Sequence, residues 1–273
     1  MKPPHNVAFL ERGIRKLTNS NENGVRLRTM MSSIIVGQFL DGAVMRGGGA
    51  LKLRYGAGIT RYTIDFDAAL RVDEERFVEE FNRRLEEGWS LFSGRLVKLP
   101  KAHPANVPEA YVMQPFEVRL TYKNQSWCSV RMEVSYNEVG DADEYDEVPL
   151  DPYIKLIFAQ LNLPEPRPVP LMKLVHQVAQ KIHGATDIKA PRAQDVIDLQ
   201  LIAGREMLDL RELKRVSERL FANRKAQSWP PKVNLSGEMV EAYAALKGDL
   251  PVLPDCASAL NWLSDFIANI QSA

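Results

Sequence analysis

Apolar residues recur with a helical period in two stretches of the first half of the chain. Residues 25–43 carry an approximate i, i+3, i+4 stripe, which predicts a helix. Residues 73–85 predict a second helix, because Phe77, Phe81 and Leu85 recur every four residues. Asp73 is a suitable N-cap for that helix and Gly88 a suitable end. Before both lie residues 1–24, a polar, mixed segment that ends in a turn-rich run.

Strict alternation of polar and apolar residues predicts strands at residues 63–67, 95–99, 116–122 and 127–136. The last two are separated by the short polar run Lys-Asn-Gln-Ser, which predicts a β-hairpin. An acidic loop follows at residues 140–147. Strands mixed with helices in this half indicate an α+β domain.

Prolines divide this half from the rest of the chain. Four prolines within residues 164–170 stiffen the backbone, so we expect a domain boundary there, with domains at residues 1–163 and 171–273. The second domain is predicted to be helical throughout, since helical spacing appears at residues 171–183, 191–202, 209–221, 238–246 and 257–270.

Composition limits the classes of protein to consider. The chain has 273 residues, 45% of them apolar, which is enough for a sizeable core. Thirty-five basic and 35 acidic residues balance, so any contact with nucleic acid must be local. The two cysteines, Cys128 and Cys256, form no metal-binding or disulfide pattern. No apolar run of about 18 residues and no signal pattern is present. We therefore expect a cytoplasmic protein without a membrane partner.

The strongest candidate chemistry lies between Arg46 and Asp67. Gly47, Gly48 and Gly49 precede a run that can be helical, so backbone N–H groups and a helix N-terminus could hold a phosphate. Asp65 and Asp67 follow on one face of the predicted strand, and paired carboxylates suit Mg²⁺ together with substrate phosphates.

Arg61, just before this strand, could add a positive fork for phosphate oxygens. Each part alone has a simpler interpretation. A glycine triplet is usually a flexible turn, and paired aspartates are usually a solvated strand edge. Their conjunction in this order is what indicates a nucleotide-transferring site.

A third carboxylate, Glu133, lies on the predicted strand at residues 127–136. If that strand lies beside the one bearing Asp65 and Asp67, Glu133 could complete a metal site. The alternative is a surface ion pair between Arg131 and Glu133, since charges on exposed strands are common.

A second charged group lies in the helical half. Lys181 flanks the apolar stripe of one helix and could extend from it into a cleft. Asp195 and Asp198 lie on a packing side of the next helix, where buried carboxylates need partners such as Lys181, Arg192 or a metal-bound phosphate. The simpler alternative is an Arg192–Asp195 pair with a solvated Asp198. The histidines (His5, His103, His176 and His183) lack any triad context, and we interpret them as structural or exposed.

At these residues the chain resembles the minimal nucleotidyltransferase fold of the DNA polymerase beta-like superfamily, and within it the AbiEii/AbiGii-type toxin nucleotidyltransferases. The resemblance rests on four blocks that span about half the chain: G-G-G-A-L-K-L-R-Y-G at residues 47–56, R-Y-T-I-D-F-D at 61–67, H-Q-V-A-Q-K-I-H at 176–183 and R-A-Q-D-V-I-D-L at 192–199. The family usually has Ser or Thr after the paired glycines, where this chain has Gly49. Backbone amides alone would then contact the phosphate.

The resemblance implies a mixed sheet flanked by helices, followed by a helical C-terminal half. It implies an enzyme that uses one or two Mg²⁺ to move a nucleoside monophosphate from an NTP to a hydroxyl of a tRNA 3′ end or a protein. Asp65, Asp67, Lys181, Asp195 and Asp198 would be catalytic.

The nucleotide-binding residues would be the three glycines, Arg61 and Arg192, and Glu133 would join the metal ligands. The biological role would be that of a bacterial toxin restrained by a cognate antitoxin, as in abortive infection by phage. A nucleotide-binding regulatory or interaction protein without turnover is the alternative.

Overall fold

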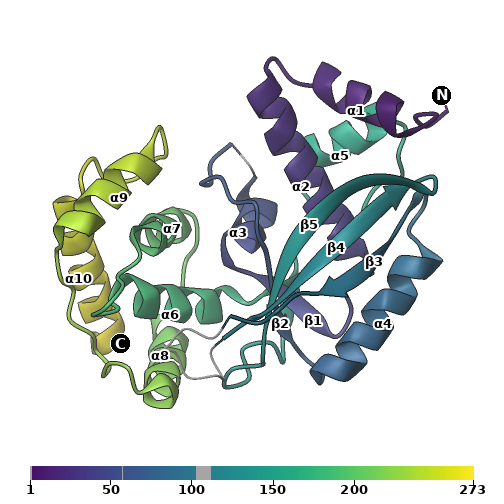
Figure 1. Cartoon of the computed structure of the whole chain (residues 1–273). Helices are drawn as coiled ribbons and strands as arrows, with labels where there is room; N and C mark the ends of the chain where they lie inside the picture. Colours follow the sequence, from purple (N-terminus) through teal and green to yellow (C-terminus); the bar gives the residue numbers. More distant parts are fainter. Residues whose placement is uncertain (1, 57, 103–111) are drawn as a thin grey trace. The chain divides into compact units, whose positions relative to one another are not determined.

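The computed structural model describes residues 2–56, 58–102 and 112–273 (Figure 1). His103 lies outside the described residues. The helices are α1 (Val7–Lys16), α2 (Asn21–Phe39), α3 (Gly47–Tyr55), α4 (Glu74–Glu87), α5 (Pro152–Gln160), α6 (Leu174–Ala185), α7 (Ala193–Ala203), α8 (Leu210–Arg224), α9 (Gly237–Lys247) and α10 (Cys256–Ser272). The strands are β1 (Ala43–Arg46), β2 (Phe66–Leu70), β3 (Phe92–Lys98), β4 (Gln114–Tyr122), β5 (Gln125–Ser135), β6 (Tyr145–Glu147) and β7 (Pro170–Met172).

These strands form one mixed sheet in the order β3-β4-β5-β2-β1-β7-β6. The pairs β2–β5 and β1–β7 are parallel, and the other neighbours are antiparallel. A mixed sheet with helices packed on it confirms the predicted α+β class. Because β2 lies between β1 and β5, residues from three distant parts of the sequence become neighbours at the middle of the sheet.

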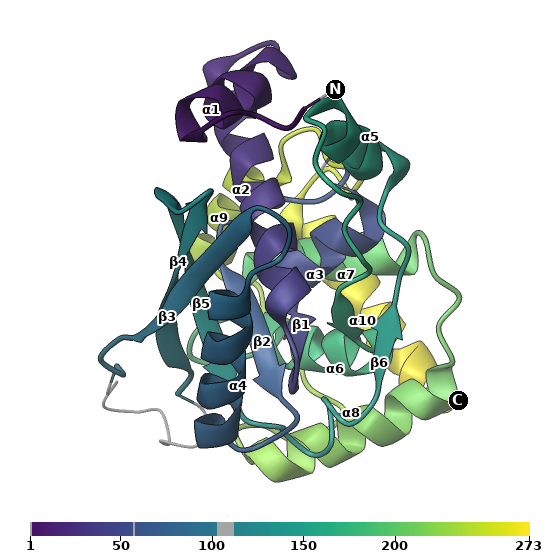
Figure 2. The same ribbon diagram turned by 90° about the vertical axis from the view of Figure 1, so that its right-hand side faces the viewer.

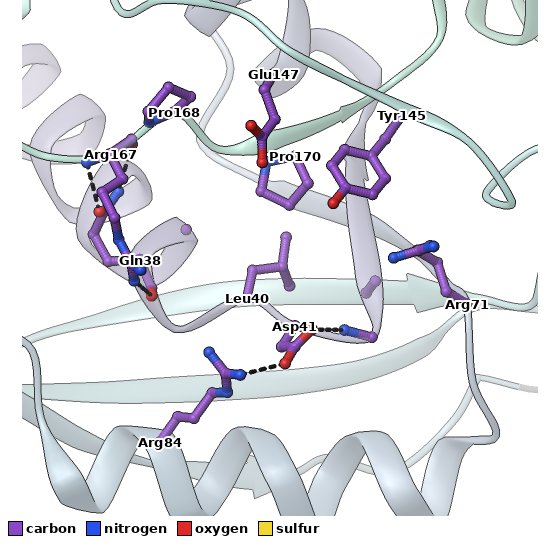
Figure 3. A pocket seen from close by; sticks show the side chains of 13 residues that line it. Gln38, Leu40, Asp41, Arg71, Arg84, Tyr145, Glu147, Arg167, Pro168 and Pro170 are labelled. Atoms are coloured by element: carbon purple, nitrogen blue, oxygen red, sulfur yellow. Dashed lines mark hydrogen bonds and ion pairs between the residues drawn. The ribbon is translucent and has the colours of Figure 1, made fainter.

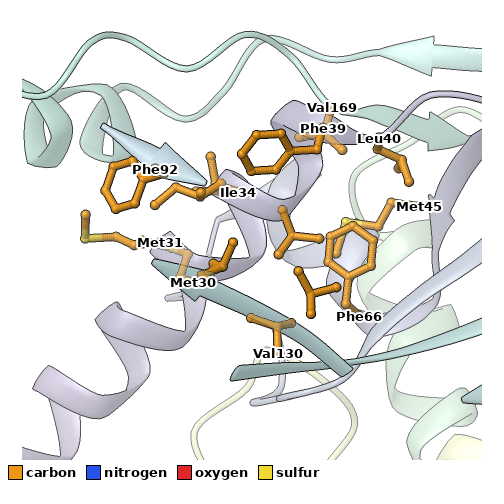
Figure 4. Close-up of a cluster of buried hydrophobic side chains, with 14 of the residues drawn as sticks. Met30, Met31, Ile34, Phe39, Leu40, Met45, Phe66, Phe92, Val130 and Val169 are labelled. Carbon is orange, nitrogen blue, oxygen red and sulfur yellow. The ribbon is translucent and has the colours of Figure 1, made fainter. Parts of the chain in front are cut away.

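The main hydrophobic core lies between one face of the sheet and the helices α2 and α4, which Figure 2 shows in front of the strands. Met31 and Ile34 from α2 pack there with Phe66 from β2 and Val130 from β5 (Figure 4). Phe66 is fully buried, so its neighbour in sequence, Asp67, must project from the opposite face. The core therefore fixes which face of β2 carries the carboxylate.

Most predicted elements of this half are confirmed. Helix α4 begins after Asp73, whose side chain accepts a hydrogen bond from the backbone N–H of Arg76, and ends at Gly88. The hairpin between β4 and β5 turns at Lys123 and Asn124, which both have positive φ, as a tight two-residue turn requires. The helix predicted at residues 25–43 is α2, displaced toward the N-terminus.

Several expectations were incomplete or wrong in detail. Strand β7 occupies the end of the proline-rich segment and the predicted start of the helix at residues 171–183, and β1 was not predicted. Helix α1 and helix α5 lie in segments for which no helix was predicted, and β6 lies within the predicted acidic loop. The strand predicted at residues 63–67 begins only at Phe66. The carbonyl of Thr63 accepts a hydrogen bond from the side chain of Lys52 on α3, so a side chain satisfies this backbone group instead of a neighbouring strand.

The described chain divides into two compact units. The first holds the sheet, with α1 to α5, and extends to Met172. The second holds Lys173–Ala273 together with the short segment Gly58–Arg61, which is inserted in the sequence between α3 and β2. Within the second unit α6 packs against α7 and α8, and α10 packs against α8 and α9, which confirms the predicted helical C-terminal half. No helix among the described residues has the length and apolarity needed to cross a membrane.

Candidate active site

Two of the predicted metal ligands lie side by side in the sheet. Asp67 on β2 is the register partner of Glu133 on the parallel strand β5, and on its other side it is the partner of Arg46 on β1. Register partners on neighbouring strands present their side chains on the same face. The expected proximity of Glu133 to the Asp67 strand is thus confirmed, and the sequence analysis missed Arg46.

Arg46 is held in this row. Its Nη1 donates a 2.9 Å hydrogen bond to Oγ of Ser135, which lies two residues beyond Glu133 on β5. Ser135 in turn donates to the carbonyl of Ala68 at 3.3 Å. A guanidinium thus lies in the same row of the sheet as the two carboxylates. The signal for it was its position immediately before the glycine triplet.

The three glycines form the first turn of α3 and do not precede it as a loop. Gly47 has φ +68°, and a Cβ added there would lie 2.5 Å from Oδ2 of Asp67. The carboxylate therefore occupies the space that any side chain at position 47 would need. The N-terminus of a helix favours negative charge, so Asp67 and an incoming phosphate would both lie in a favourable field.

Close packing also explains why residue 49 is a glycine. An added Cβ would lie 2.5 Å from Cε of Met45 and 3.4 Å from the backbone oxygen of Asp65. A Ser or Thr at this position would thus displace the end of the Met45 side chain. The close approach also shows that Asp65 lies against the first turn of α3, immediately before β2 begins.

Lys52 is a second residue that the sequence analysis missed. It lies on α3, is only 7% exposed, and donates a 2.6 Å hydrogen bond from Nζ to the carbonyl of Thr63. Its ammonium also lies 5.3 Å from the ring centre of Tyr62. A buried lysine thus fixes the segment that leads to Asp65. Its signal in the sequence was one cation within the otherwise apolar Ala-Leu-Lys-Leu run.

The oxygen donors of this row fit Mg²⁺, which proteins commonly hold with one or two carboxylates while substrate phosphates supply further ligands. Within the described ranges, no three His, Cys, Asp or Glu side chains gather into a complete metal cluster. The alternative for Glu133 is also realised, because Arg131 Nη2 lies 3.0 Å from its Oε1.

In the helical unit, Lys181 on α6 is buried between two carboxylates of α7. Its Nζ donates to Oδ2 of Asp198 at 2.6 Å and to Oδ1 of Asp195 at 3.1 Å. The side chain of Asp198 is 2% exposed, so the alternative with a solvated Asp198 is wrong. The predicted partnership of Lys181 with these aspartates is confirmed. The ammonium is buried, however, whereas a lysine that extends into a cleft was expected.

Two arginines complete this charged cluster. Arg61 Nε lies 3.1 Å from Oδ1 of Asp198, and Arg192 Nε lies 2.8 Å from Oδ2 of Asp195. The Arg192–Asp195 pair of the simpler alternative is therefore present. Three cations face two carboxylates, which leaves one positive charge in excess.

Gly184 on α6 leaves room for this charged cluster because it has no side chain. A Cβ added there would lie 2.1 Å from Nη2 of Arg192 and 2.3 Å from Oδ2 of Asp195. His183, next to it, is buried with its ring 4.9 Å from that of Phe221, which supports the structural interpretation of this histidine.

Comparison with known proteins identifies the family of this chain. Residues 29–255 match the family described as nucleotidyl transferase AbiEii toxin, type IV TA system. A search of curated proteins gives no match. Among solved structures, the nucleotidyltransferase toxin MenT4 from Mycobacterium tuberculosis H37Rv aligns over 98% of this chain and 90% of its own, with TM-score 0.61 and 13% identity.

JHP933 from Helicobacter pylori aligns over 93% of this chain and 94% of its own, with TM-score 0.46 and 15% identity. At 13% identity, the similarity to MenT4 bears on the fold alone. The family match carries the assignment, because it covers most of the chain, including the glycine turn, Asp67, Glu133 and the Lys181 cluster. The chain belongs to the AbiEii nucleotidyl transferase toxin family of type IV toxin–antitoxin systems and is a nucleotidyltransferase.

Proposed function

We propose that the protein uses Mg²⁺ and transfers a nucleoside monophosphate from an NTP to an acceptor hydroxyl, on a tRNA 3′ end or on a protein. The observation that carries the proposal is the register of Asp67 with Glu133 beside the N-terminus of α3. It combines a carboxylate pair for a hard cation with backbone N–H groups for phosphate oxygens.

Each residue of the first unit has a distinct task in this proposal. Asp67 and Glu133, together with substrate phosphates, would hold the cation, and Asp65, which immediately precedes β2, is proposed as a further ligand. The cation would lower the pKa of the acceptor hydroxyl and neutralise charge on the leaving pyrophosphate. The N–H groups of Gly47, Gly48 and Gly49 orient the phosphates. Arg46 supplies a positive charge in the same row of the sheet.

The helical unit contributes positive charge for the nucleotide. Lys181 is the proposed phosphate contact, and Asp195 and Asp198 orient it through charge-assisted hydrogen bonds. Arg61 and Arg192 are proposed to contact the nucleotide as well. Arg61 donates from Nε to both carboxylate oxygens of Asp198. Its Nη groups could then donate to phosphate oxygens.

The biological role that follows is a toxin whose cognate antitoxin is encoded separately, active in the cytoplasm during phage defence. Family membership supports a toxin–antitoxin system. The antitoxin would then have to restrain or reverse the proposed transfer.

The test is incubation of the protein with Mg²⁺ and each of the four NTPs, labelled at the α-phosphate, together with total tRNA or total cell protein. We expect label in one acceptor fraction, lost on ribonuclease or protease treatment respectively. An NTP labelled at the γ-phosphate should leave both fractions unlabelled, and Asp67→Asn should abolish transfer. Nucleotide binding without label in either fraction would replace the proposal with a regulatory nucleotide-binding role.

A further inference from the structure

A pocket lies in the first unit, at the other end of β1 and β2 from Asp67. It has a volume of about 320 Å³ and is lined by the end of α2, the turn before β1, the residue after β2, helix α4, strand β6 and the proline-rich segment before β7 (Figure 3). Three arginines from three separate segments line it: Arg71, Arg84 and Arg167. Nothing in the transfer reaction requires this concentration of guanidinium groups.

Each guanidinium uses some of its N–H donors in hydrogen bonds or ion pairs with the protein. Arg71 donates from Nε to the carbonyl of Ala142 at 3.1 Å and from Nη2 to that of Asp143 at 3.3 Å. Arg84 pairs through Nη2 with Asp41, which also lines the pocket. Arginine has five N–H donors, so further donors of each group remain for a ligand.

Arg167 is placed by a buried side chain. Gln38 is 5% exposed and binds the backbone of Arg167 in both directions: Oε1 accepts from its N–H at 2.8 Å and Nε2 donates to its carbonyl at 3.0 Å. The Arg167 guanidinium in turn donates from Nη2 to the carbonyl of Gln38 at 3.3 Å. The position of this arginine is therefore fixed by the core helix α2.

The rest of the lining is apolar or acidic. Leu40, Pro168, Pro170 and the ring of Tyr145 form a wall, and the Arg71 guanidinium lies 4.8 Å from the Tyr145 ring centre. The acidic members of the lining are Asp41, which is paired with Arg84, and Glu147. Arg84 also pairs through Nε with Glu80 of α4 at 2.9 Å, so carboxylates neutralise its charge. Arg71 and Arg167 donate to backbone carbonyls instead, and the other acidic residue of the lining is Glu147, so positive charge remains toward the pocket. Planar guanidinium forks match the oxygens of phosphate, and the volume is in the range of small-molecule sites.

We propose that this pocket binds a small phosphate-bearing anion, at a site separate from the transferase site. The pocket and the transferase site lie at opposite ends of β1 and β2. On β1, Ala43 lines the pocket, whereas Arg46 at the other end is the partner of Asp67. On β2, Arg71 follows the last residue and lines the pocket. The ligand is of the inorganic polyphosphate or nucleotide class. The apolar wall beside Tyr145 gives a base or sugar somewhere to pack.

The experiment measures pyrophosphate binding by isothermal titration calorimetry, with EDTA present and in the Asp67→Asn protein, so that binding at the transferase site is suppressed. We expect saturable binding to one site. Replacement of a guanidinium that contacts the anion removes charge-assisted hydrogen bonds, so Arg71→Gln and Arg167→Gln should each weaken binding about tenfold or more. Arg95→Gln removes the same charge from an exposed position of β3 outside the pocket and should leave affinity unchanged.

Glu147→Gln provides a test of the opposite sign. It removes a negative charge from the lining, so pyrophosphate affinity should rise several-fold at low salt. This variant tests the proposal even if an arginine variant fails to fold. Tighter binding of ATP than of pyrophosphate would assign the site to nucleotides, and equal binding would assign it to inorganic phosphates. Absence of binding, or equal losses in Arg95→Gln and Arg71→Gln, would overturn the site.

Discussion

Asp67 and Glu133 are direct register partners on the parallel strands β2 and β5, although they are far apart in the sequence. Parallel pairing requires a long crossover, and here helix α4 and the strands β3 and β4 lie between the two residues in the chain. The carboxylate pair is thus a product of the sheet order, and it is the part of the site that is most directly testable.

The first prediction concerns Asp67. Asp67→Ala should abolish transfer, at least about a hundredfold, because the charge that the metal and transition state need is lost. The fold should stay intact or become slightly more stable, since clustered carboxylates repel one another. Initial rates with α-labelled NTP and a thermal melt measure both effects. Glu86→Gln, at an exposed position of α4, is the control, and full transfer by Asp67→Ala would refute the mechanism.

The second prediction separates the two interpretations of Glu133. Glu133→Gln keeps the shape but removes the charge, so the Mg²⁺ concentration for half-maximal rate should rise about tenfold while the melting temperature changes little. Arg131→Gln breaks the same ion pair without touching the carboxylate and should leave the Mg²⁺ titration unchanged. If both variants titrate like the parent protein, Glu133 is only a surface partner of Arg131.

The third prediction concerns the close approach of Gly47 to Asp67. Gly47→Ala places a Cβ 2.5 Å from the original position of Oδ2 and forces alanine into φ +68°, which costs about 1–2 kcal/mol. We expect a lower melting temperature and a large loss of transfer, because the carboxylate must move. Gly58→Ala is the matched control, since a Cβ there has no atom within 4 Å. Equal, small effects of the two substitutions would show that Gly47 is merely a turn residue.

The fourth prediction concerns Lys181. Lys181→Met leaves two buried carboxylates with only Arg61 and Arg192 as cations, so the unfolding free energy should fall by about 3–5 kcal/mol. Adding Asp195→Asn should recover part of that loss, because the unpaired charge is removed.

Transfer rates measured well below each melting temperature then report the role in catalysis. We expect Lys181→Met to lose most of the rate, and Asp195→Asn to add little to that loss, since groups acting as one unit fail together. A Lys181→Met protein that is folded and fully active would limit the cluster to a structural role.

The fifth prediction concerns pH. Burial raises the pKa of the Cys128 thiol from 9.0 to about 12. The folded protein therefore keeps this thiol neutral, and it should react slowly with iodoacetamide at pH 8, whereas the unfolded chain should react fast.

Since the unfolded thiol loses its proton first, Cys128 stabilises the fold fully below pH about 9, and this contribution falls as pH rises toward about 12. Cys128→Ala should flatten that part of the stability profile measured by denaturant unfolding. An unchanged slope, or rapid alkylation of the native thiol, would contradict the raised pKa of this partly buried side chain.

The sequence by itself determined the elements whose signals are local. The spacing of Phe77, Phe81 and Leu85, with Asp73 before them, specifies α4, because period and cap depend only on neighbouring residues. The alternation around Phe116 likewise specifies β4. The glycine triplet and the two aspartates indicated the candidate site for the same reason, as did the spacing of Asp195 and Asp198 on one helix.

Tertiary structure decided what depends on contacts between distant residues. The strand order brought Glu133 and Arg46 beside Asp67, and no local pattern contains that order. Burial of Lys181 between two aspartates depends on how α6 packs on α7. The strand predicted at residues 63–67 begins only at Phe66, because the buried side chain of Lys52 binds the Thr63 carbonyl in place of a strand partner. The pocket arginines meet because the end of β2, helix α4 and the proline-rich segment before β7 come together around the start of β1.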